Sequence, residues 1–188
     1  MTETVRLALI SHAMTDATAA SRFPVDESVN ETGQRQVSSS IDFGSQQITV
    51  LSGPEQRCLQ TARLLGLAPS VESRLADLHV GRWRGCALSD VRPADLAAWV
   101  TDPAFASHGG ESVTELMSRV RDWLESLTVD RCRIVAVTHQ AVVRASIIIA
   151  LDAPPKSFWR IDIAPAARTD LHFRGHAWTL RFVGRPCS

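Results

Sequence analysis

Short apolar runs and longer amphipathic segments alternate along the chain. Three apolar runs rich in β-forming residues predict buried strands at residues 5–10, 48–51 and 134–137. Apolar residues that recur every three to four positions predict helices at 55–65, 113–127 and 141–151. A turn at residues 30–33 leads into a further helix that carries Val37 and Ile41. Segments 158–163, 170–173 and 178–183 are predicted as closing strands, the last two as a hairpin.

Strands that alternate with helices favour an α/β fold. In such a fold a mostly parallel sheet is covered by helices on both faces, which gives three α/β/α layers. The 188 residues show no internal repeat or linker, so the sequence predicts a single domain, 1–188. Residues 13–30 and 75–110 have no regular period and are broken by glycine or proline, which predicts irregular structure there.

Polar residues follow each of the three apolar strands. These endings are Ser11-His12, Ser52-Gly53-Pro54 and Thr138-His139. Ligands of open α/β sheets bind at the carboxyl ends of the strands. One histidine at such a position is usually structural, but two at equivalent positions predict a shared site. We therefore expect His12 and His139 to meet there from opposite ends of the chain.

Composition narrows the class of protein. Apolar residues make up 45% of the chain, and 20 basic residues balance 20 acidic ones, so no overall charge attracts it to nucleic acid or an anionic membrane. The first residues lack a signal-peptide pattern, and the most apolar run, 145–151, is too short to span a bilayer. The four cysteines have no C-x-x-C spacing, which argues against a zinc site or a disulfide framework. These features predict a cytoplasmic protein with no membrane or nucleic-acid partner.

A series of motifs, in order along nearly the whole chain, resembles those of the histidine phosphatase superfamily, the phosphoglycerate mutase-like proteins. Residues 9–15, Leu-Ile-Ser-His-Ala-Met-Thr, resemble the family's Leu-Val-Arg-His-Gly-Glu-Thr. Residues 52–62, Ser-Gly-Pro-Glu-Gln-Arg-Cys-Leu-Gln-Thr-Ala, are similar to Ser-Ser-Pro-x-x-Arg-Ala-x-Gln-Thr-Ala. Residues 75–85 resemble Leu-x-Glu-x-x-Phe-Gly-x-Trp-Glu-Gly, and weaker matches lie at 30–36, 109–112 and 137–145.

The resemblance implies roles for particular residues. His12 corresponds to the nucleophile that attacks phosphorus and becomes a phosphohistidine. Arg57 and His139 fall where donors surround the phosphoryl oxygens, and Asp77 falls at the position of the general acid, where many relatives carry glutamate. The family needs neither a metal nor another cofactor. Residues 77–110 correspond to the segment that covers the pocket and sets the substrate.

Two residues depart from the family pattern inside this predicted site. Ser11 replaces the motif arginine, and loss of one such preorganised donor typically costs about 10²–10³ in turnover. Gln140 replaces the glycine that usually follows the second histidine, which places an amide near the pocket. Ser11, Gln140 and Arg57 are therefore predicted to line the phosphate site. Arg22 and Arg144 are candidates to replace the missing arginine, although each could equally be a surface residue.

Three functions remain open on the sequence. The first is a phosphatase of the small broad-specificity branch, which includes α-ribazole phosphatase-like members, acting on a small anionic, phosphorylated metabolite. The second is an acid–base enzyme, an isomerase, lyase or hydrolase, that uses the same two histidines on a non-phosphoryl anion. The third is an anion-binding domain without catalysis. Retention of His12, Arg57, Asp77 and His139 favours an enzyme. The substrate and the oligomeric state, including a homodimer, stay open.

Overall fold

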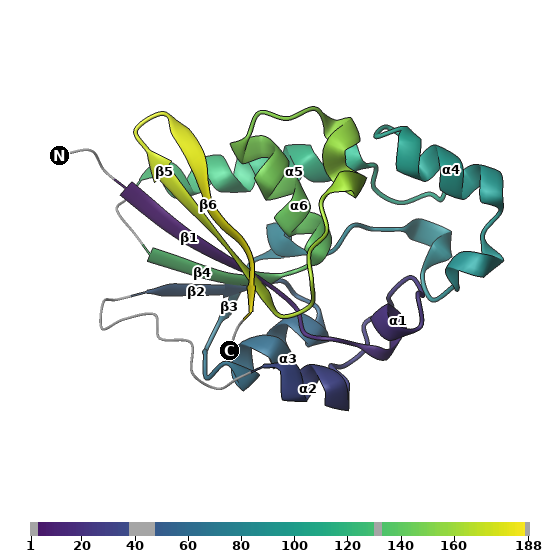
Figure 1. The fold of residues 1–188 in the computed structure, drawn as a ribbon, viewed down its shortest axis with the longest axis horizontal. Coiled ribbons are helices and arrows are strands. Elements are labelled where there is room, and N and C mark those ends of the chain that lie inside the picture. Colours follow the sequence, from purple (N-terminus) through teal and green to yellow (C-terminus); the bar gives the residue numbers. More distant parts are fainter. Residues whose placement is uncertain (1–3, 38–47, 130–132, 187–188) are drawn as a thin grey trace.

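The computed structural model of the chain describes residues 4–37, 48–129 and 133–186, and its centre is a six-stranded sheet (Figure 1). The strand order is β3-β2-β4-β1-β5-β6. The strands are β1 (Thr4–Ser11), β2 (Thr49–Ser52), β3 (Ser70–Val71), β4 (Arg133–Thr138), β5 (Ala167–Arg174) and β6 (Ala177–Pro186). The first four pair in parallel, whereas β5 and β6 form an antiparallel edge on β1. The sheet is thus mostly parallel, as the sequence predicts.

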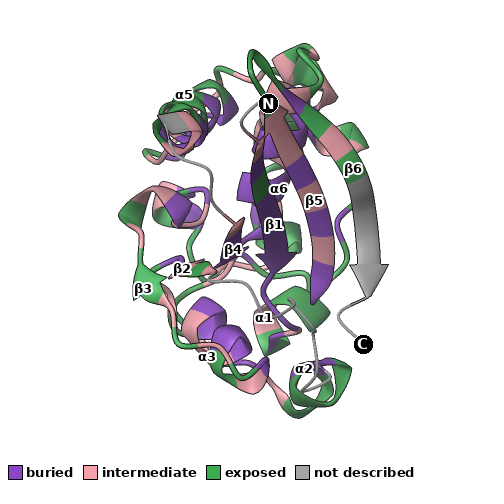
Figure 2. Ribbon diagram, turned by 90° about the vertical axis from the view of Figure 1, so that its left-hand side faces the viewer, coloured by how far each residue is buried: buried purple, intermediate pink, exposed green. Residues whose placement is uncertain are grey.

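Helices cover both faces of this sheet. Side chains alternate between the faces of a strand, and along β1 the odd residues Leu7 and Leu9 pack in a core cluster with α5 (Val113–Ser126) and α6 (Gln140–Ala150). The even residues Ala8 and Ile10 pack in a second cluster with α3 (Gln56–Leu64). Both faces of β1 and β4 are consequently buried (Figure 2). The three-layer α/β/α prediction is confirmed.

Most predicted elements lie where the sequence placed them. α5 begins at a capping box, in which Ser112 and Glu115 bond each other's backbone amides, and this explains its sharp start. β5 and β6 form the predicted hairpin. The helix expected after residue 30 is α2 (Glu31–Gln36), capped by Asn30, and Val37 ends it. Ile41, which was expected on the same helix, lies outside the described residues.

The strand predicted at 158–163 is wrong. Residues Pro155–Arg160 form a 3-10 helix, η5, that begins directly after Pro154. Proline favours the first turn of a helix because its φ angle is fixed near the helical value. Phe158 is 1% exposed, so the apolar residues of this segment report burial in the core rather than the two-residue period of a strand.

The irregular middle segment contains more regular structure than predicted. It holds α4 (Pro93–Thr101), whose apolar residues lie nearly all round the helix and so form no distinct stripe, and the 3-10 turns η2 (Gly81–Trp83) and η3 (Leu88–Asp90). The short helix α1 (Asp16–Ala19) was likewise expected as loop. Aromatic contacts organise the segment, because the ring of Trp83 lies 5.8 Å from that of Trp99 and 4.8 Å from that of His108. His108 is buried in this cluster.

A helix that spans a bilayer needs about 20 consecutive, mainly apolar residues. Among the described residues, none of the helices is both long enough and apolar enough to cross a bilayer.

Candidate active site

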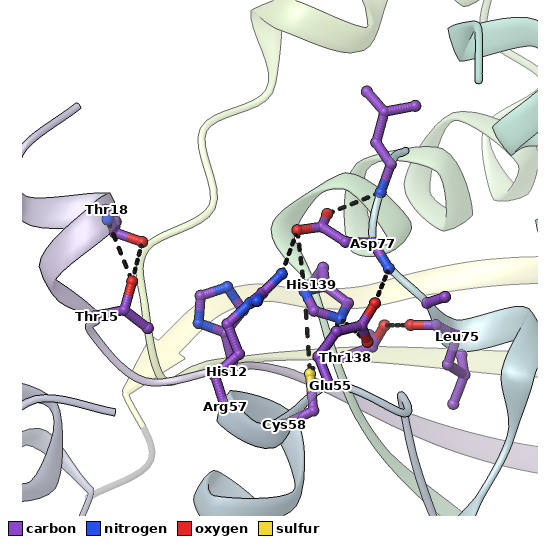
Figure 3. A network of polar contacts seen from close by, with 12 residues as sticks. His12, Thr15, Thr18, Glu55, Arg57, Cys58, Leu75, Asp77, Thr138 and His139 are labelled. Carbon is purple, nitrogen blue, oxygen red and sulfur yellow. Dashed lines mark hydrogen bonds and ion pairs between the residues drawn. The ribbon is translucent and has the colours of Figure 1, made fainter. Parts of the chain in front are cut away.

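The two histidines predicted to share a site do meet. β1 and β4 are neighbours, and Ser11 is paired with Thr138, so His12 and His139 leave the sheet side by side (Figure 3). The backbone N–H of His12 donates to the carbonyl of Thr138 at 2.7 Å. The two rings lie 5.3 Å apart at an interplanar angle of 63°. Both side chains are buried.

His12 is held as a neutral ring. Its Nδ1 atom lies 2.8 Å from the carbonyl oxygen of Ala13; because that oxygen can only accept, Nδ1 carries the proton and Nε2 keeps its lone pair. Burial, followed by the charges of His139 and Arg57, lowers the pKa of His12 to about 3. Near neutral pH the ring is therefore an unprotonated nucleophile or base.

Arg57 enters the site from the first turn of α3. Residues 57 and 61 share one side of this helix, and the Thr61 hydroxyl donates to the Arg57 carbonyl while accepting from the N–H of Ala13. The guanidinium is almost fully buried. It donates to the Val25 carbonyl at 2.8 Å through Nη1 and to Asp77 Oδ2 at 2.7 Å through Nη2. Its Nε–H is buried without a partner among the described residues.

Asp77 joins Arg57 to His139. Its Oδ2 atom lies 3.3 Å from Nδ1 of His139 as well as 2.7 Å from Arg57. Burial alone would raise the pKa of Asp77, but His139, Arg57 and His12 outweigh it and hold that pKa well below its ordinary range. The predicted general acid is thus an ionised carboxylate in this arrangement.

His139 lies between two carboxylates. Its Nε2 atom is 2.8 Å from Oε2 of Glu55, and its Nδ1 faces Asp77. Burial opposes a charged ring, yet the charge of Asp77 and the neighbouring Cys58 and Asp77 contacts raise the pKa of His139 well above its ordinary value. Hydrogen bonding to His139 lowers the pKa of Glu55 against the opposite effect of burial. The site therefore holds an imidazolium beside a neutral imidazole.

Glu55 and Cys58 are site residues that sequence reasoning missed. Glu55 Oε1 also accepts the backbone N–H of Asp77 at 3.0 Å. The Glu55 carboxylate therefore contacts both His139 and Asp77, the residue on the other nitrogen of the His139 ring. The Cys58 sulfur lies 3.2 Å from Nε2 of His139. Glu55 directly follows the Ser-Gly-Pro ending of β2, and an acidic residue at such a strand end was the available signal.

The segment that carries Asp77 is fixed from behind by Arg119 on α5. Its guanidinium pairs with Glu111 at 2.8 Å and donates to the carbonyls of Arg74 and Ala76. The hydroxyl of Thr138 donates to the carbonyl of Leu75 at 2.7 Å. These bonds tie the loop before Asp77 to β4, and thus to His139, with little freedom for the carboxylate to drift.

Ser11 and Arg22 lie apart from these contacts. The Ser11 hydroxyl is fully buried, donates to the carbonyl of Ala164 at 2.6 Å and accepts the N–H of Ala167 at 3.0 Å. It therefore joins β1 to the chain that enters β5. The exposed Arg22 reaches the carbonyl of Gly85 at 3.4 Å.

Gln140 and Arg144 lie on α6, the helix that His139 begins. Gln140 is its first residue and is half-buried. Arg144, one turn further, donates through Nε to the carbonyl of Ile161 at 2.8 Å, and its guanidinium lies over the ring of Trp159 at 5.4 Å. Burial lowers the pKa of Arg144, while the charges of Asp162 and Asp77 oppose that change.

A cavity of about 190 Å³ opens beside these groups. Glu55, Arg57, Asp77, His79 and Arg84 are among the residues that line it, whereas His12 and His139 are not. The volume suits a small ligand, and Arg57 contributes a cation to the lining. The site thus combines two buried histidines at the carboxyl ends of β1 and β4 with a neighbouring cavity lined by charged residues.

Known proteins match both the sequence and the fold. Residues 7–185 match the profile of the histidine phosphatase superfamily (branch 1). The glucosyl-3-phosphoglycerate phosphatase of Mycolicibacterium vanbaalenii is 27% identical over 213 residues, which cover 92% of this chain and 93% of the relative. A solved mycobacterial glucosyl-3-phosphoglycerate phosphatase, in complex with VO3, has a TM-score of 0.84 at 27% identity, over 96% of this chain and 98% of that chain.

One similarity concerns part of a longer protein. A bifunctional protein of Mycobacterium tuberculosis is 26% identical over 196 residues, which cover 96% of this chain but 54% of the relative. The chain therefore spans about half the length of the first curated relatives that it matches.

Proposed function

Because the chain belongs to the histidine phosphatase superfamily, we propose that it hydrolyses phosphate monoesters of a small metabolite through a phosphohistidine on His12. One observation carries this proposal: a neutral, buried His12 ring, with Nδ1 tied to the Ala13 carbonyl, lies 5.3 Å from the His139 ring and interacts with the charges of His139 and Arg57. A free imidazole lone pair beside two fixed cations suits attack on a phosphoryl group.

The proposed reaction has two displacements. In the first, Nε2 of His12 attacks phosphorus, the ester P–O bond breaks, and its electron pair leaves with the alcohol oxygen, which takes a proton. In the second, water attacks the phosphohistidine, the P–N bond breaks, and inorganic phosphate leaves while His12 regains its lone pair. Charge that develops on the phosphoryl oxygens is stabilised by Arg57 and by the imidazolium of His139.

The resting ion pair implies an order of events. Asp77 is an ionised carboxylate on Arg57, so an incoming phosphate must take the guanidinium from it. Once released, Asp77 loses one of the charges that lower its pKa, while His139 still faces it at 3.3 Å. We propose that Asp77 then takes up a proton from solvent, delivers it to the leaving oxygen, and later takes a proton from the attacking water and returns it to solvent, while His139 keeps its own proton.

Other donors then offset the missing motif arginine. The N-terminus of α6 points its free N–H groups toward the site, because His139 occupies the capping position without a side-chain cap, and such an end attracts phosphate. Gln140 lies in its first turn and is proposed to bind phosphate through its amide. Arg144 and Arg22 remain proposed cations. The hydroxyl of Ser11 is hydrogen-bonded to the backbone of Ala164 and Ala167. Binding of phosphate by Ser11 stays a prediction, and it would require the hydroxyl to leave these partners.

Turnover of p-nitrophenyl phosphate and of glucosyl-3-phosphoglycerate tests the proposal. The wild-type chain should release phosphate and should form an acid-labile, base-stable phosphoryl adduct on His12. His12→Ala should lose both, whereas His176→Ala, which removes an exposed histidine of the terminal hairpin, should keep both. A wild-type chain that is inactive, but becomes a phosphatase as Ser11→Arg, would point instead to the acid–base chemistry of a repurposed site.

A further inference from the structure

Two potential metal ligands, on Glu55 and Cys58, lie beside the Nε2 atom of His139, which is itself a third. Glu55, Cys58 and His139 each offer a ligand atom, and these atoms lie within 4.8 Å of one another. Nε2 of His139 is 2.8 Å from the Glu55 carboxylate and 3.2 Å from the Cys58 sulfur. We propose that Glu55, Cys58 and His139 form a binding site for a thiophilic divalent ion of the Zn²⁺ type.

The separations suit a tetrahedral ion after small shifts. Zinc binds sulfur at about 2.3 Å, imidazole nitrogen at about 2.0–2.1 Å and carboxylate oxygen at about 2.0–2.2 Å. Tetrahedral angles then place ligand atoms roughly 3.3–3.6 Å apart. Relative to Nε2, the Glu55 oxygen at 2.8 Å lies about 0.5 Å below that range and the Cys58 sulfur at 3.2 Å about 0.1 Å below it, so the carboxylate must move the most. Three protein ligands leave the fourth position for water, and thiolate with imidazole favours zinc over magnesium or calcium.

Asp77 gives His139 the orientation that a ligating histidine needs. Metal-binding histidines usually donate their other ring N–H to a carboxylate, which fixes the tautomer and aims the free nitrogen at the ion. Nδ1 of His139 faces Asp77 at 3.3 Å, whereas Nε2 faces Glu55 at 2.8 Å; the Cys58 sulfur is closer to Nε2, at 3.2 Å, than to Nδ1, at 4.0 Å. The Asp77–His139 pair (Figure 3) is thus already arranged to support an ion at Nε2.

Two positions at which the chain departs from the quoted motif converge on this atom. Cys58 stands where the motif has alanine, and Gly53 stands where it has the second serine. A Cβ atom on Gly53 would lie 3.2 Å from both Nε2 of His139 and the Glu55 carboxylate, and 2.8 Å from the Leu75 carbonyl. Glycine leaves this space open, and cysteine adds the soft ligand. The same substitutions that distinguish the chain from the motif therefore assemble the proposed site.

Charge and access also fit the ion. Glu55 and Asp77 supply two negative charges, and Arg57 with protonated His139 balances them. A divalent ion replaces two protons, the thiol proton of Cys58 and the proton between His139 and Glu55; both go to solvent, and the net charge is unchanged. Glu55 has a side chain 20% exposed and lines the 190 Å³ cavity, which gives the ion a path. An ion there removes the Nε2 proton of His139, so inhibition of hydrolysis follows if the proposed function holds.

Cobalt binding tests the site by a readout independent of catalysis. In a chain with Cys86, Cys132 and Cys187 replaced by serine, Co²⁺ should produce a near-ultraviolet thiolate-to-cobalt absorption that saturates at one equivalent and disappears when Zn²⁺ is added. Cys58→Ala should abolish the band. Glu55→Gln should weaken Co²⁺ binding by about tenfold or more, whereas Glu72→Gln, which alters an acid paired with Arg74, should not change it.

The results that overturn the proposal are distinct from those that overturn the phosphatase. A folded chain that gives no thiolate band with excess cobalt, or a band that persists in Cys58→Ala, rules the site out. If Cys58→Ala does not fold, X-ray absorption of the zinc-loaded starting chain decides: one sulfur among the ligands supports the site, and none excludes it. An inactive chain that still shows the band keeps the metal site and loses the proposed function.

Discussion

The carboxylate of Asp77 and the guanidinium of Arg57 form a buried ion pair, with 2.7 Å between Oδ2 and Nη2. The side chain of Arg57 is 2% exposed and that of Asp77 is 21% exposed. The same carboxylate oxygen contacts His139. Asp77 thus pairs with both cations of the site, so under the proposed mechanism a phosphoryl group would have to compete with this carboxylate for them.

The Asp77→Asn substitution tests two roles of this carboxylate, the buried ion pair with Arg57 and the proposed donation of a proton to the leaving group. An amide cannot neutralise Arg57, and removal of one partner from a buried pair should lower the free energy of unfolding by about 2–4 kcal/mol. Loss of the proton donor should reduce kcat by about 10²-fold or more for alkyl phosphates. The loss should be much smaller for p-nitrophenyl phosphate, because p-nitrophenolate leaves without a proton. Chemical denaturation and the two kcat values measure this.

A matched control exists on the surface. Asp95→Asn breaks an ion pair with Arg92, whose side chain is 80% exposed, and should change stability by less than about 1 kcal/mol. Equal losses of kcat on both classes of substrate in Asp77→Asn would contradict the acid role of Asp77.

Stability should be greatest near pH 6.5, because the two site histidines titrate in opposite directions. The pKa of His12 falls from 6.5 to about 3 on folding, so below pH 6.5 the unfolded chain takes up a proton that the folded chain refuses. The pKa of His139 is raised well above 6.5, so its stabilisation is complete below pH 6.5 and is lost as the pH rises through that raised value. The pKa of Asp77 is lowered on folding, so protonation of this carboxyl at acidic pH causes a further loss of stability.

Thermal unfolding from pH 4 to 9.5 checks this expectation. His12→Asn should flatten the decline between pH 6.5 and 4, and His139→Gln should flatten the decline above pH 6.5. A His176→Gln variant, altered at an exposed loop position, should follow the wild-type curve. A Tm that rises steadily above pH 7 in the wild type would show that His139 is not held as an imidazolium.

The Ser11→Ala substitution should affect stability far more than catalysis. It removes a buried hydroxyl that links the Ala164 carbonyl to the Ala167 amide, and it leaves both backbone groups without that partner. We expect a loss of about 1–3 kcal/mol in the free energy of unfolding and a kcat within about threefold of wild type. Ser89→Ala, at an exposed position, serves as control. A tenfold rise in KM without loss of stability would place the hydroxyl on the phosphate.

Ser11 stands where the family motif has an arginine, and Arg144 and Arg22 are the proposed substitutes for that cation. Comparing Arg144→Met with Arg22→Met tests which of them binds phosphate. Arg144 is anchored beside Trp159 and interacts with the charge of Asp77, so its loss should raise KM for phosphate monoesters by about tenfold, the value of one charge-assisted hydrogen bond. Arg22 is exposed and bonded to the Gly85 carbonyl, so its loss should change KM by less than about twofold. The reverse order would assign the role to Arg22.

Elements with a clear period were predicted well. α5 has an apolar stripe and a capping box, and β1 and β4 are continuous apolar runs buried on both faces. α4 was missed because apolar residues lie all around it, so that no stripe marks the side, with Leu96 and Trp99, that packs against the core. The segment around Phe158 was misassigned because a buried 3-10 turn and a buried strand can be equally apolar. Periodicity identifies an element only where apolar and polar residues separate onto different faces or where an apolar run has the length of a strand.

The sequence alone determined the family, the layered fold and the convergence of His12 with His139. The local pattern places each histidine at the end of an apolar strand, and the carboxyl ends of parallel strands lie at the same edge of a sheet. The tertiary structure decided the charge states: it set Glu55 and Cys58 on Nε2 of His139, paired Asp77 with Arg57 and turned Ser11 toward the backbone. Such contacts join residues far apart in the chain, and their effect on pKa depends on burial and on distances of a few ångströms, which no local pattern encodes.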